Sequence, residues 1–150
     1  MKGQAAFPSP IAAVIAVVIH EGQTLLVRRA NPPDAGLWGF PGGRIEYGET
    51  VEAAALRELT EETSVLGEAC GVITALDILD RSDDGTLRYH FVLIAVRCRW
   101  LAGHPRAADD ALEARWFRIA DLGADEIAMS ADVEVIARLA RNLSQRDSSA

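Results

Sequence analysis

Residues 43–65 read GRIEYGETVEAAALRELTEETSV, and this stretch decides the fold because it contains a complete helix signal. Thr50 is a good N-cap, Glu52 lies in the first turn, and the alanine- and leucine-rich interior predicts a helix that runs to about Thr63. The second half of this helix carries three glutamates without a matching set of cations: Glu58, Glu61 and Glu62. The sequence therefore predicts a helix with negative charge concentrated near its C-terminal end.

The three glutamates project from one side of the predicted helix. At about 100° per residue, Glu62 lies roughly 40° from Glu58, and Glu61 lies about 60° from Glu58. Like charges at these spacings cost a helix on the order of 0.2–0.5 kcal/mol per pair. One interpretation is a solvated acidic face, which is the usual meaning of such a cluster. The other is a divalent-cation site, because hard oxygen ligands suit Mg²⁺ or Mn²⁺.

The spacing of the surrounding residues favours the cation site. Glycine, charged and aliphatic residues stand at fixed intervals, at Gly43, Glu49, Arg57, Glu58, Leu59, Glu61, Glu62 and Val65. This pattern resembles the Nudix box, in which Gly, five residues, Glu and seven residues precede Arg-Glu-aliphatic-any-Glu-Glu-any-Gly-aliphatic. Ser64 stands where the family has glycine. Because a positive φ is cheap only without a Cβ, serine there is expected to cost stability or to shift the helix end slightly.

The resemblance extends beyond the box. Residues 40–43, Phe-Pro-Gly-Gly, are a common Nudix lead-in, and residues 28–43 together with 109–117 resemble the small ADP-ribose pyrophosphatase-like branch. In all, the likeness covers roughly residues 11–143. It implies an α/β fold, the Nudix-type α/β/α sandwich with a mixed β-sheet between helices. It also implies metal-dependent hydrolysis of a nucleoside diphosphate linked to another moiety, with water attacking a diphosphate phosphorus.

The resemblance also implies a role for each residue of the box. Glu58 and Glu62 would bind Mg²⁺, or Mn²⁺, directly, and Glu61 would bind a metal or its water. The carbonyl of Gly42 would supply another oxygen. Arg57 would pair with Glu49 and fix the helix against the preceding loop. Either Glu58 or Glu61 would accept the proton of the attacking water.

Residues outside the box complete the predicted site. Some family members add a carboxylate from the loop before a later strand, for which the sequence offers three alternatives: Asp109, Asp110 and Glu113. Arg29 and Arg44 are either phosphate ligands or ordinary surface arginines. Trp38 and Phe40 either stack on a nucleobase or belong to the core.

The rest of the chain reads as strands and one further helix. Strands are predicted at 11–20, 24–29, 72–79, 87–100 and 115–119, and the apolar faces of 91–96 indicate a strand that is central in the sheet. Apolar residues from Val133 to Leu143 mark a C-terminal amphipathic helix. Residues 1–150 are predicted to form one domain with a core at about 11–143, and the first ten residues and residues 144–150 are expected to fray.

Composition restricts the class of partner. The net charge of −7 argues against binding of a nucleic acid polymer, because phosphate backbones require concentrated lysine and arginine. The longest apolar run is too short to span a membrane and lacks the features of a secretory signal, so a cytoplasmic location is expected. The expected partner is a small-molecule nucleotide. The sequence leaves open whether the protein forms a homodimer.

Three functions remain as alternatives. The first is hydrolysis of ADP-ribose or a related nucleoside diphosphate derivative, and the second is a MutT-like pyrophosphatase that acts on nucleoside triphosphates. Both would use the same glutamate-bearing helix, and they would differ in the pocket beyond it, which residues 30–40 and 80–113 are predicted to build. The third is a Nudix module that senses a nucleotide without cutting it. Retention of all three glutamates favours the two hydrolases over the sensor.

Overall fold

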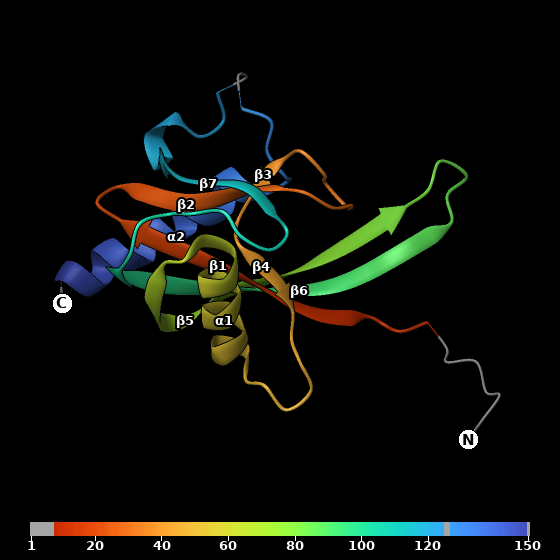
Figure 1. Ribbon diagram of the computed structural model, residues 1–150, viewed down its shortest axis with the longest axis horizontal. Helices are drawn as coiled ribbons and strands as arrows, with labels where there is room; N and C mark the ends of the chain where they lie inside the picture. Colours follow the sequence, from red (N-terminus) through yellow and green to blue (C-terminus); the bar gives the residue numbers. More distant parts are fainter. Residues whose placement is uncertain (1–7, 125–126, 150) are drawn as a thin grey trace.

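The computed structural model describes residues 8–124 and 127–149, and in this part of the chain two α-helices cover a mixed sheet (Figure 1). The strands are β1 (Ile11–His20), β2 (Gln23–Arg29), β3 (Trp38–Gly39), β4 (Gly42–Arg44), β5 (Leu66–Arg81), β6 (Leu87–Ala102) and β7 (Ala111–Arg118). The helices are α1 (Val51–Thr63), the short 3-10 helix η1 (Ile119–Asp121) and α2 (Val133–Ser149). No helix among the described residues is long and apolar enough to cross a membrane.

The sheet is organised around β1. Its order is β3-β2-β1-β6-β5, with β4 also paired to β1 and β7 paired to β2. The β1–β6 pair is parallel, whereas the other pairs between these strands are antiparallel. The predicted mixed sheet is therefore confirmed. The interior position predicted for the strand that contains residues 91–96 is also confirmed, because β6 lies between β1 and β5.

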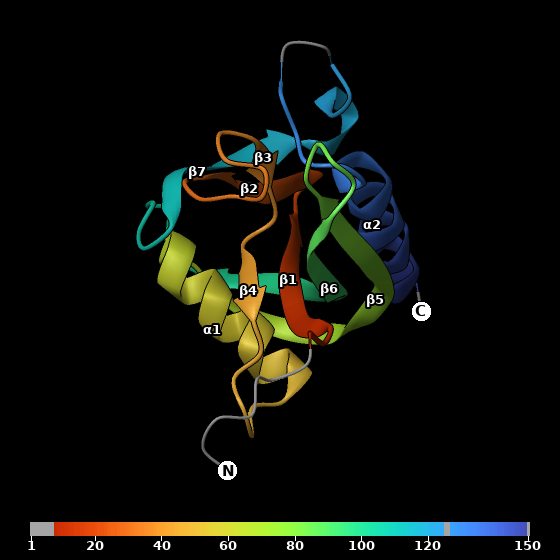
Figure 2. The ribbon, with the colours of Figure 1, turned by 90° about the vertical axis from the view of Figure 1, so that its right-hand side faces the viewer.

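β1 contributes to two hydrophobic cores, because successive side chains of a strand point to opposite faces of the sheet. Its residues 14, 16 and 18 are fully buried in one core with Leu59 of α1. Residues 15 and 17 are buried in a second core with Ile136 of α2. The two helices accordingly lie on opposite sides of the sheet, as Figure 2 shows. This arrangement confirms the predicted α/β/α sandwich.

The bounds of α1 follow from its caps. The hydroxyl of Thr50 accepts a hydrogen bond of 3.1 Å from the N–H of Ala53, which satisfies one of the free donors of the first turn. The helix ends at Thr63, and Ser64 then adopts the left-handed conformation with φ of 64°. The N–H of Ser64 donates to the Thr60 carbonyl at 2.9 Å. Serine therefore occupies the glycine position of the box without moving the predicted helix end.

Three segments are longer than the sequence indicated. β5 begins at Leu66 and not at Val72, because pairing with β6 extends it past register shifts between Ala69 and Thr74. β7 begins at Ala111 and not at Arg115, because its pairing with β2 continues as far as Arg29. The prediction that residues 144–150 fray is wrong for residues 144–149, which continue α2. Residue 150 and residues 1–7 lie outside the described part of the chain, and residues 8–10 form neither helix nor strand.

The end of α2 is held by an arginine of the sheet. Arg97 of β6 donates to the carboxylate of Asp147 at 2.5 Å and to the hydroxyl of Ser144 at 3.2 Å. It also donates to the carbonyl of Cys70 at 3.3 Å. Because the partners of Arg97 are 27 to 50 residues away in the chain, local periodicity gave no sign of this contact.

Substitution of Ser64 by glycine should stabilise the protein. The left-handed conformation costs a residue with a Cβ about 1 kcal/mol or more, and glycine removes that cost. We expect Ser64→Gly to raise the free energy of unfolding by about 1 kcal/mol and the melting temperature by roughly 2–4 °C. Chemical and thermal denaturation would measure both values. Ser64→Ala keeps the Cβ and serves as the control, so equal stabilisation by the two substitutions would contradict the argument.

Candidate active site

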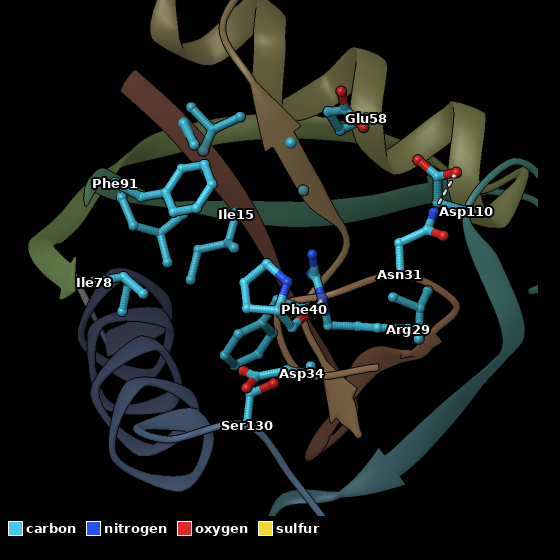
Figure 3. Close-up of a pocket in the computed structure, with 18 of the residues that line it drawn as sticks. Ile15, Arg29, Asn31, Asp34, Phe40, Glu58, Ile78, Phe91, Asp110 and Ser130 are labelled. Carbon is cyan, nitrogen blue, oxygen red and sulfur yellow. Dashed lines mark hydrogen bonds between the residues drawn. The ribbon is translucent and has the colours of Figure 1, made fainter. Parts of the chain in front are cut away.

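A cavity of about 600 Å³ opens between the sheet, the loop after β2 and the start of α2 (Figure 3). Its volume lies within the range typical of small-molecule sites. One wall carries polar and charged residues: Arg29, Asn31, Asp34, Arg44, Glu58, Glu62 and Asp110. Another wall is largely apolar and includes Ile15, Phe40, Leu76, Ile78, Phe91, Leu93 and Ile136. The cavity thus places charged groups beside a surface that suits an aromatic or aliphatic ligand.

Two of the three predicted glutamates face this cavity from α1. Glu62 is only 6% exposed, and its carboxylate accepts a hydrogen bond of 2.7 Å from the N–H of Gly42. Glu58 lies against Gly43, where an added Cβ would stand 2.5 Å from the carboxylate oxygen of Glu58. A Cβ on Gly42 would instead meet the Val14 carbonyl of β1 at 2.1 Å. Gly43 therefore allows Glu58 to approach β4, and Gly42 allows β4 to lie close to β1.

Arg57 balances the negative charge at the base of the site. Its guanidinium donates to both carboxylate oxygens of Glu49, at 2.7 and 2.9 Å, which is the ion pair that the box implies. It also donates to Glu58 at 2.8 Å and to Glu61 at 3.2 Å. A further bond of 3.1 Å to the carbonyl of Arg44 ties α1 to the end of β4. Arg57 thus fixes the helix and neutralises part of the glutamate cluster.

Glu61 lies apart from the other two glutamates. Its side chain is 45% exposed, pairs with Arg57 and does not line the cavity. Glu58 and Glu62, in contrast, have side chains that are mostly buried beside β4. The structure therefore brings Glu58 and Glu62 together at the cavity wall and leaves Glu61 at its outer side.

Burial changes the proton affinity of both cavity-facing glutamates. Desolvation raises the pKa of Glu62 to about 8, against the smaller opposing effect of the hydrogen bond from Gly42. Desolvation likewise raises the pKa of Glu58, although Arg57 opposes the shift. In contrast, the hydrogen bond from Arg57 lowers the pKa of Glu49 to about 2. Placing negative charge at Glu58 and Glu62 is therefore costly in the absence of a cation.

This donor set fits a hard divalent cation. Two buried carboxylates face the same cavity and destabilise each other's charged forms, as the charge of Glu58 raises the pKa of Glu62. Within residues 8–124 and 127–149, no three Asp, Glu, His or Cys side chains are grouped closely enough to hold a metal by themselves. Mg²⁺ suits this arrangement, because it retains several waters and shares substrate phosphates instead of filling an all-protein cage.

The structure distinguishes the three candidate carboxylates near β7. Asp110 lines the cavity, and its carboxylate accepts a hydrogen bond of 3.0 Å from the side chain of Asn31. Glu113 pairs with Arg28 at 2.9 Å and lies outside the cavity lining, as does Asp109. The preceding loop is held against the end of α1, since the N–H of Ala108 donates to the Glu62 carbonyl at 3.1 Å. Asp110 is therefore the one of the three that joins Glu58 and Glu62 at the cavity.

The two predicted phosphate ligands both line the cavity. Figure 3 shows Arg29 pointing into it between Phe40 and Asn31, and its Nε donates to the Pro33 carbonyl at 3.3 Å. The positive charge of Arg29 acts on Glu62 and opposes the rise of its pKa. Arg44 is exposed at the end of β4. Arg29 is thus the better placed of the two arginines to hold an anion next to the glutamates.

The two predicted aromatic residues have different surroundings. Phe40 is 3% exposed in the core and borders the cavity, so it can contact a ligand only with part of its ring. Trp38 packs edge-on against Phe117, with 4.9 Å between ring centroids, and does not line the cavity. The core alternative therefore describes Trp38, and base stacking by Trp38 is not supported by its position.

Sequence reasoning found only part of the cavity wall. The predicted pocket segments, residues 30–40 and 80–113, do contribute to the lining, for example with Asn31 of the loop after β2 and Phe91 of β6. Ile78 of β5 and Ile136 of α2 were missed, because they read as ordinary apolar residues of a strand and of an amphipathic helix.

Comparison with known proteins places this chain in a family. The family model described as NUDIX domain matches residues 9–139. The chain belongs to the Nudix hydrolase family. The predicted resemblance is confirmed, since the model matches most of the chain in addition to the box.

Individual Nudix relatives point to two substrate classes. The chain is 34% identical to an ADP-ribose pyrophosphatase of Methanocaldococcus jannaschii, over 75% of this chain and 64% of that protein. It is 40% identical to a Mycobacterium tuberculosis protein named "Putative 8-oxo-dGTP diphosphatase 2", over 87% of this chain and 89% of that protein. A crystal structure of a MutT Nudix hydrolase from Burkholderia pseudomallei has 26% identity and a TM-score of 0.75, covering 88% and 98% of the two chains.

The stability of this Nudix domain should depend on pH through Glu62. Its pKa is about 8 in the folded state, against the ordinary 4.5, so the folded protein retains a proton that the unfolded chain releases. In the presence of a chelator, stability should therefore fall as the pH rises through this interval, by on the order of 5 kcal/mol. Chemical denaturation at several pH values would measure the slope.

Glu62→Gln provides the control for this pH dependence. The substitution removes the titrating group and keeps a side chain of similar shape, while the other titrating residues remain. We expect the decline in stability between pH 4.5 and about 8 to be clearly smaller in the variant. Equal slopes in the two proteins would show that Glu62 is not the group responsible.

Proposed function

We propose that the protein catalyses Mg²⁺-dependent hydrolysis of a nucleoside diphosphate linked to a second moiety, with ADP-ribose as the leading substrate. The observation that carries this proposal is the pair of buried carboxylates, Glu58 and Glu62, which face one cavity together with Arg29. The identity to an ADP-ribose pyrophosphatase supports the substrate class. Mn²⁺ is the alternative ion, because it accepts the same oxygen ligands.

Glu58 and Glu62 are the residues that would hold the ion, with the carbonyl of Gly42 as a further ligand. Asp110 lines the same cavity and would act through a water of the ion. When bound, the ion neutralises charge on the diphosphate oxygens and acidifies a water. Glu61 lies outside the cavity and is proposed to act through Arg57 or through solvent around the ion.

The proton of the attacking water is assigned to Glu58. A general base is most effective when its pKa approaches the working pH, and burial raises the pKa of Glu58 from its ordinary value. As the water oxygen bonds to phosphorus, its proton passes to the Glu58 carboxylate and the bridging P–O bond breaks. For ADP-ribose, the products are AMP and ribose 5-phosphate.

Other residues would bind and orient the substrate. Arg29 would hold diphosphate oxygens, since a guanidinium forms strong charge-assisted hydrogen bonds with phosphate. The apolar wall with Ile78 and Phe91 would cover a nucleoside and exclude water from it. Arg57 and Glu49 are positioning residues, because they hold Glu58 and the β4 end in place without lining the cavity.

Hydrolysis of an oxidised nucleoside triphosphate is the second candidate. It is favoured by the match to the mycobacterial relative, which covers 89% of that protein at 40% identity. The same carboxylates would serve, with water attacking a phosphorus to release a nucleoside monophosphate and pyrophosphate. Hydrolysis of ADP-ribose and hydrolysis of an oxidised nucleoside triphosphate differ in the part of the substrate that the apolar wall of the cavity would contact.

A substrate panel would test the proposal. We expect turnover of ADP-ribose with Mg²⁺, and loss of turnover with a chelator. Nucleoside diphosphate sugars, dinucleotides and 8-oxo-dGTP complete the panel, with release of monophosphate, phosphate or pyrophosphate as the measurement. Preference for 8-oxo-dGTP would select the second candidate. No turnover of any member would contradict an enzymatic function.

Glu62→Gln should lower kcat by at least about a hundredfold, because it removes a charged ligand from the cation site. Glu52→Gln is the matched control, since it makes the same chemical change on an exposed turn of the same helix. Circular dichroism would establish that both variants are folded. Activity of Glu62→Gln close to that of Glu52→Gln would contradict the assignment of the metal ligands.

Arg29 and its neighbour provide a second matched pair. Arg29→Ala removes a charged donor from the cavity, and we expect KM to rise by about tenfold or more. Arg28 projects to the other face of β2 and pairs with Glu113 at 2.9 Å, so Arg28→Ala should change KM little. Steady-state kinetics on the preferred substrate would measure both. Equal effects of the two substitutions would show that Arg29 has no particular role in substrate binding.

A further inference from the structure

The outer half of β5 forms a free edge of the sheet. β5 ends the strand order, and no described strand pairs with its outer side. Figure 1 shows the outer half of the β5–β6 hairpin extending beyond the body of the protein. The register with β6 is regular from Thr74 to Asp80, whereas shifts interrupt it between Ala69 and Thr74 and again between Asp80 and Arg81. Residues 74–80 thus present a regular edge without a strand partner, and Arg81 follows it directly. Such an edge usually either binds another strand or is protected.

Exposure alternates along this edge from one residue to the next. Leu76, Ile78 and Asp80 are partly buried and line the cavity. The residues between and after them are exposed: the side chain of Asp77 is 75% exposed, Leu79 is 51% exposed and also borders the cavity, and Arg81 is exposed. The exposed face therefore carries a negative, an apolar and a positive residue at intervals of two.

We propose that this edge pairs with the same edge of a second copy, antiparallel and with the two-fold axis at Leu79. In that register Leu79 lies opposite Leu79 of the second copy, and Asp77 lies opposite Arg81 in both directions. Opposite charges in directly facing positions stabilise an antiparallel pair, and an apolar pair lies between them. A two-fold interface requires a surface that is complementary to itself, and this sequence of three residues satisfies that requirement.

The charges select this register over its neighbours. A two-fold axis at Asp77 would place two carboxylates in contact, and an axis at Arg81 would place two guanidiniums in contact. Asp77 also lies 3.6 Å from the ring of His90, and Arg81 donates to the Gly85 carbonyl at 3.0 Å. These contacts leave carboxylate lone pairs and guanidinium N–H groups free for the second copy.

The proposed pairing would extend the wall of the cavity. On the cavity-facing side of the strand, Ile78 would lie opposite Asp80 of the second copy. The sheet would then continue past the rim formed by β5. This proposal concerns an interface and does not depend on which substrate the cavity accepts.

Sedimentation of the full chain over about a hundredfold range of concentration would test the proposal, because dimerisation follows mass action. We expect the wild-type protein to show a reversible monomer–dimer equilibrium. Asp77→Arg alone, or Arg81→Asp alone, turns both opposite-charge pairs into like-charge pairs. Each should weaken the dimer by about tenfold or more. A wild-type protein that remains monomeric at every concentration would overturn the proposal.

The charge pattern provides two rescues. The double variant with Asp77→Arg and Arg81→Asp restores both opposite-charge pairs, so it should dimerise like the wild type. An equimolar mixture of the two single variants should form a heterodimer for the same reason. Glu68→Arg is the control, because it makes the same change in charge on β5 beyond the register shifts and should leave dimerisation unchanged. The proposed register would be overturned if the single variants dimerised as strongly as the wild type. It would also be overturned if the double variant or the mixture were folded but did not dimerise.

Discussion

The site depends on the close approach of α1 to β4. Gly43 leaves room for Glu58, because a Cβ there would stand 2.5 Å from its carboxylate oxygen. Gly42 lets β4 lie close to β1, and its N–H donates to the carboxylate of Glu62. The burial that results from this packing raises the pKa values of both glutamates. The charged forms of Glu58 and Glu62 are therefore costly, and a bound cation would offset that cost.

A single guanidinium makes this concentration of charge compatible with a folded chain. Arg57 contacts Glu49, Glu58 and Glu61 and also binds the carbonyl at the end of β4. Its planar group presents several donors at once, which an ammonium could not match in the same geometry. Arg57 of the Nudix box thus has two structural effects. It anchors α1 to the end of β4, and it reduces the repulsion between Glu58 and Glu61.

Features set by neighbouring residues in the chain could be predicted from the sequence. Features set by contacts between distant segments could not. Helix α1 was predictable to the residue because Thr50 caps it and the fixed spacing of the box runs through it. The interior position of β6 followed from its two apolar faces. That Asp110 lines the cavity, and Asp109 and Glu113 do not, could be seen only in the fold, because the sequence does not show which way neighbouring carboxylates point. The position of Trp38 likewise depended on Phe117, far along the chain.

Helix α2 is held by Arg97 at its C-terminal end and borders the cavity at its N-terminal end. Arg97 donates hydrogen bonds to Ser144 and Asp147. Val133 and Ile136, in the first turn of α2, border the cavity. A helix is stiff along its axis, so a tether at one end limits tilting at the other. Removal of residues 144–149 would leave the mostly buried guanidinium of Arg97 without the carboxylate of Asp147. The C-terminal end of α2 would then be held less firmly against the sheet. The last turn of α2 is therefore expected to help keep the shape of the cavity.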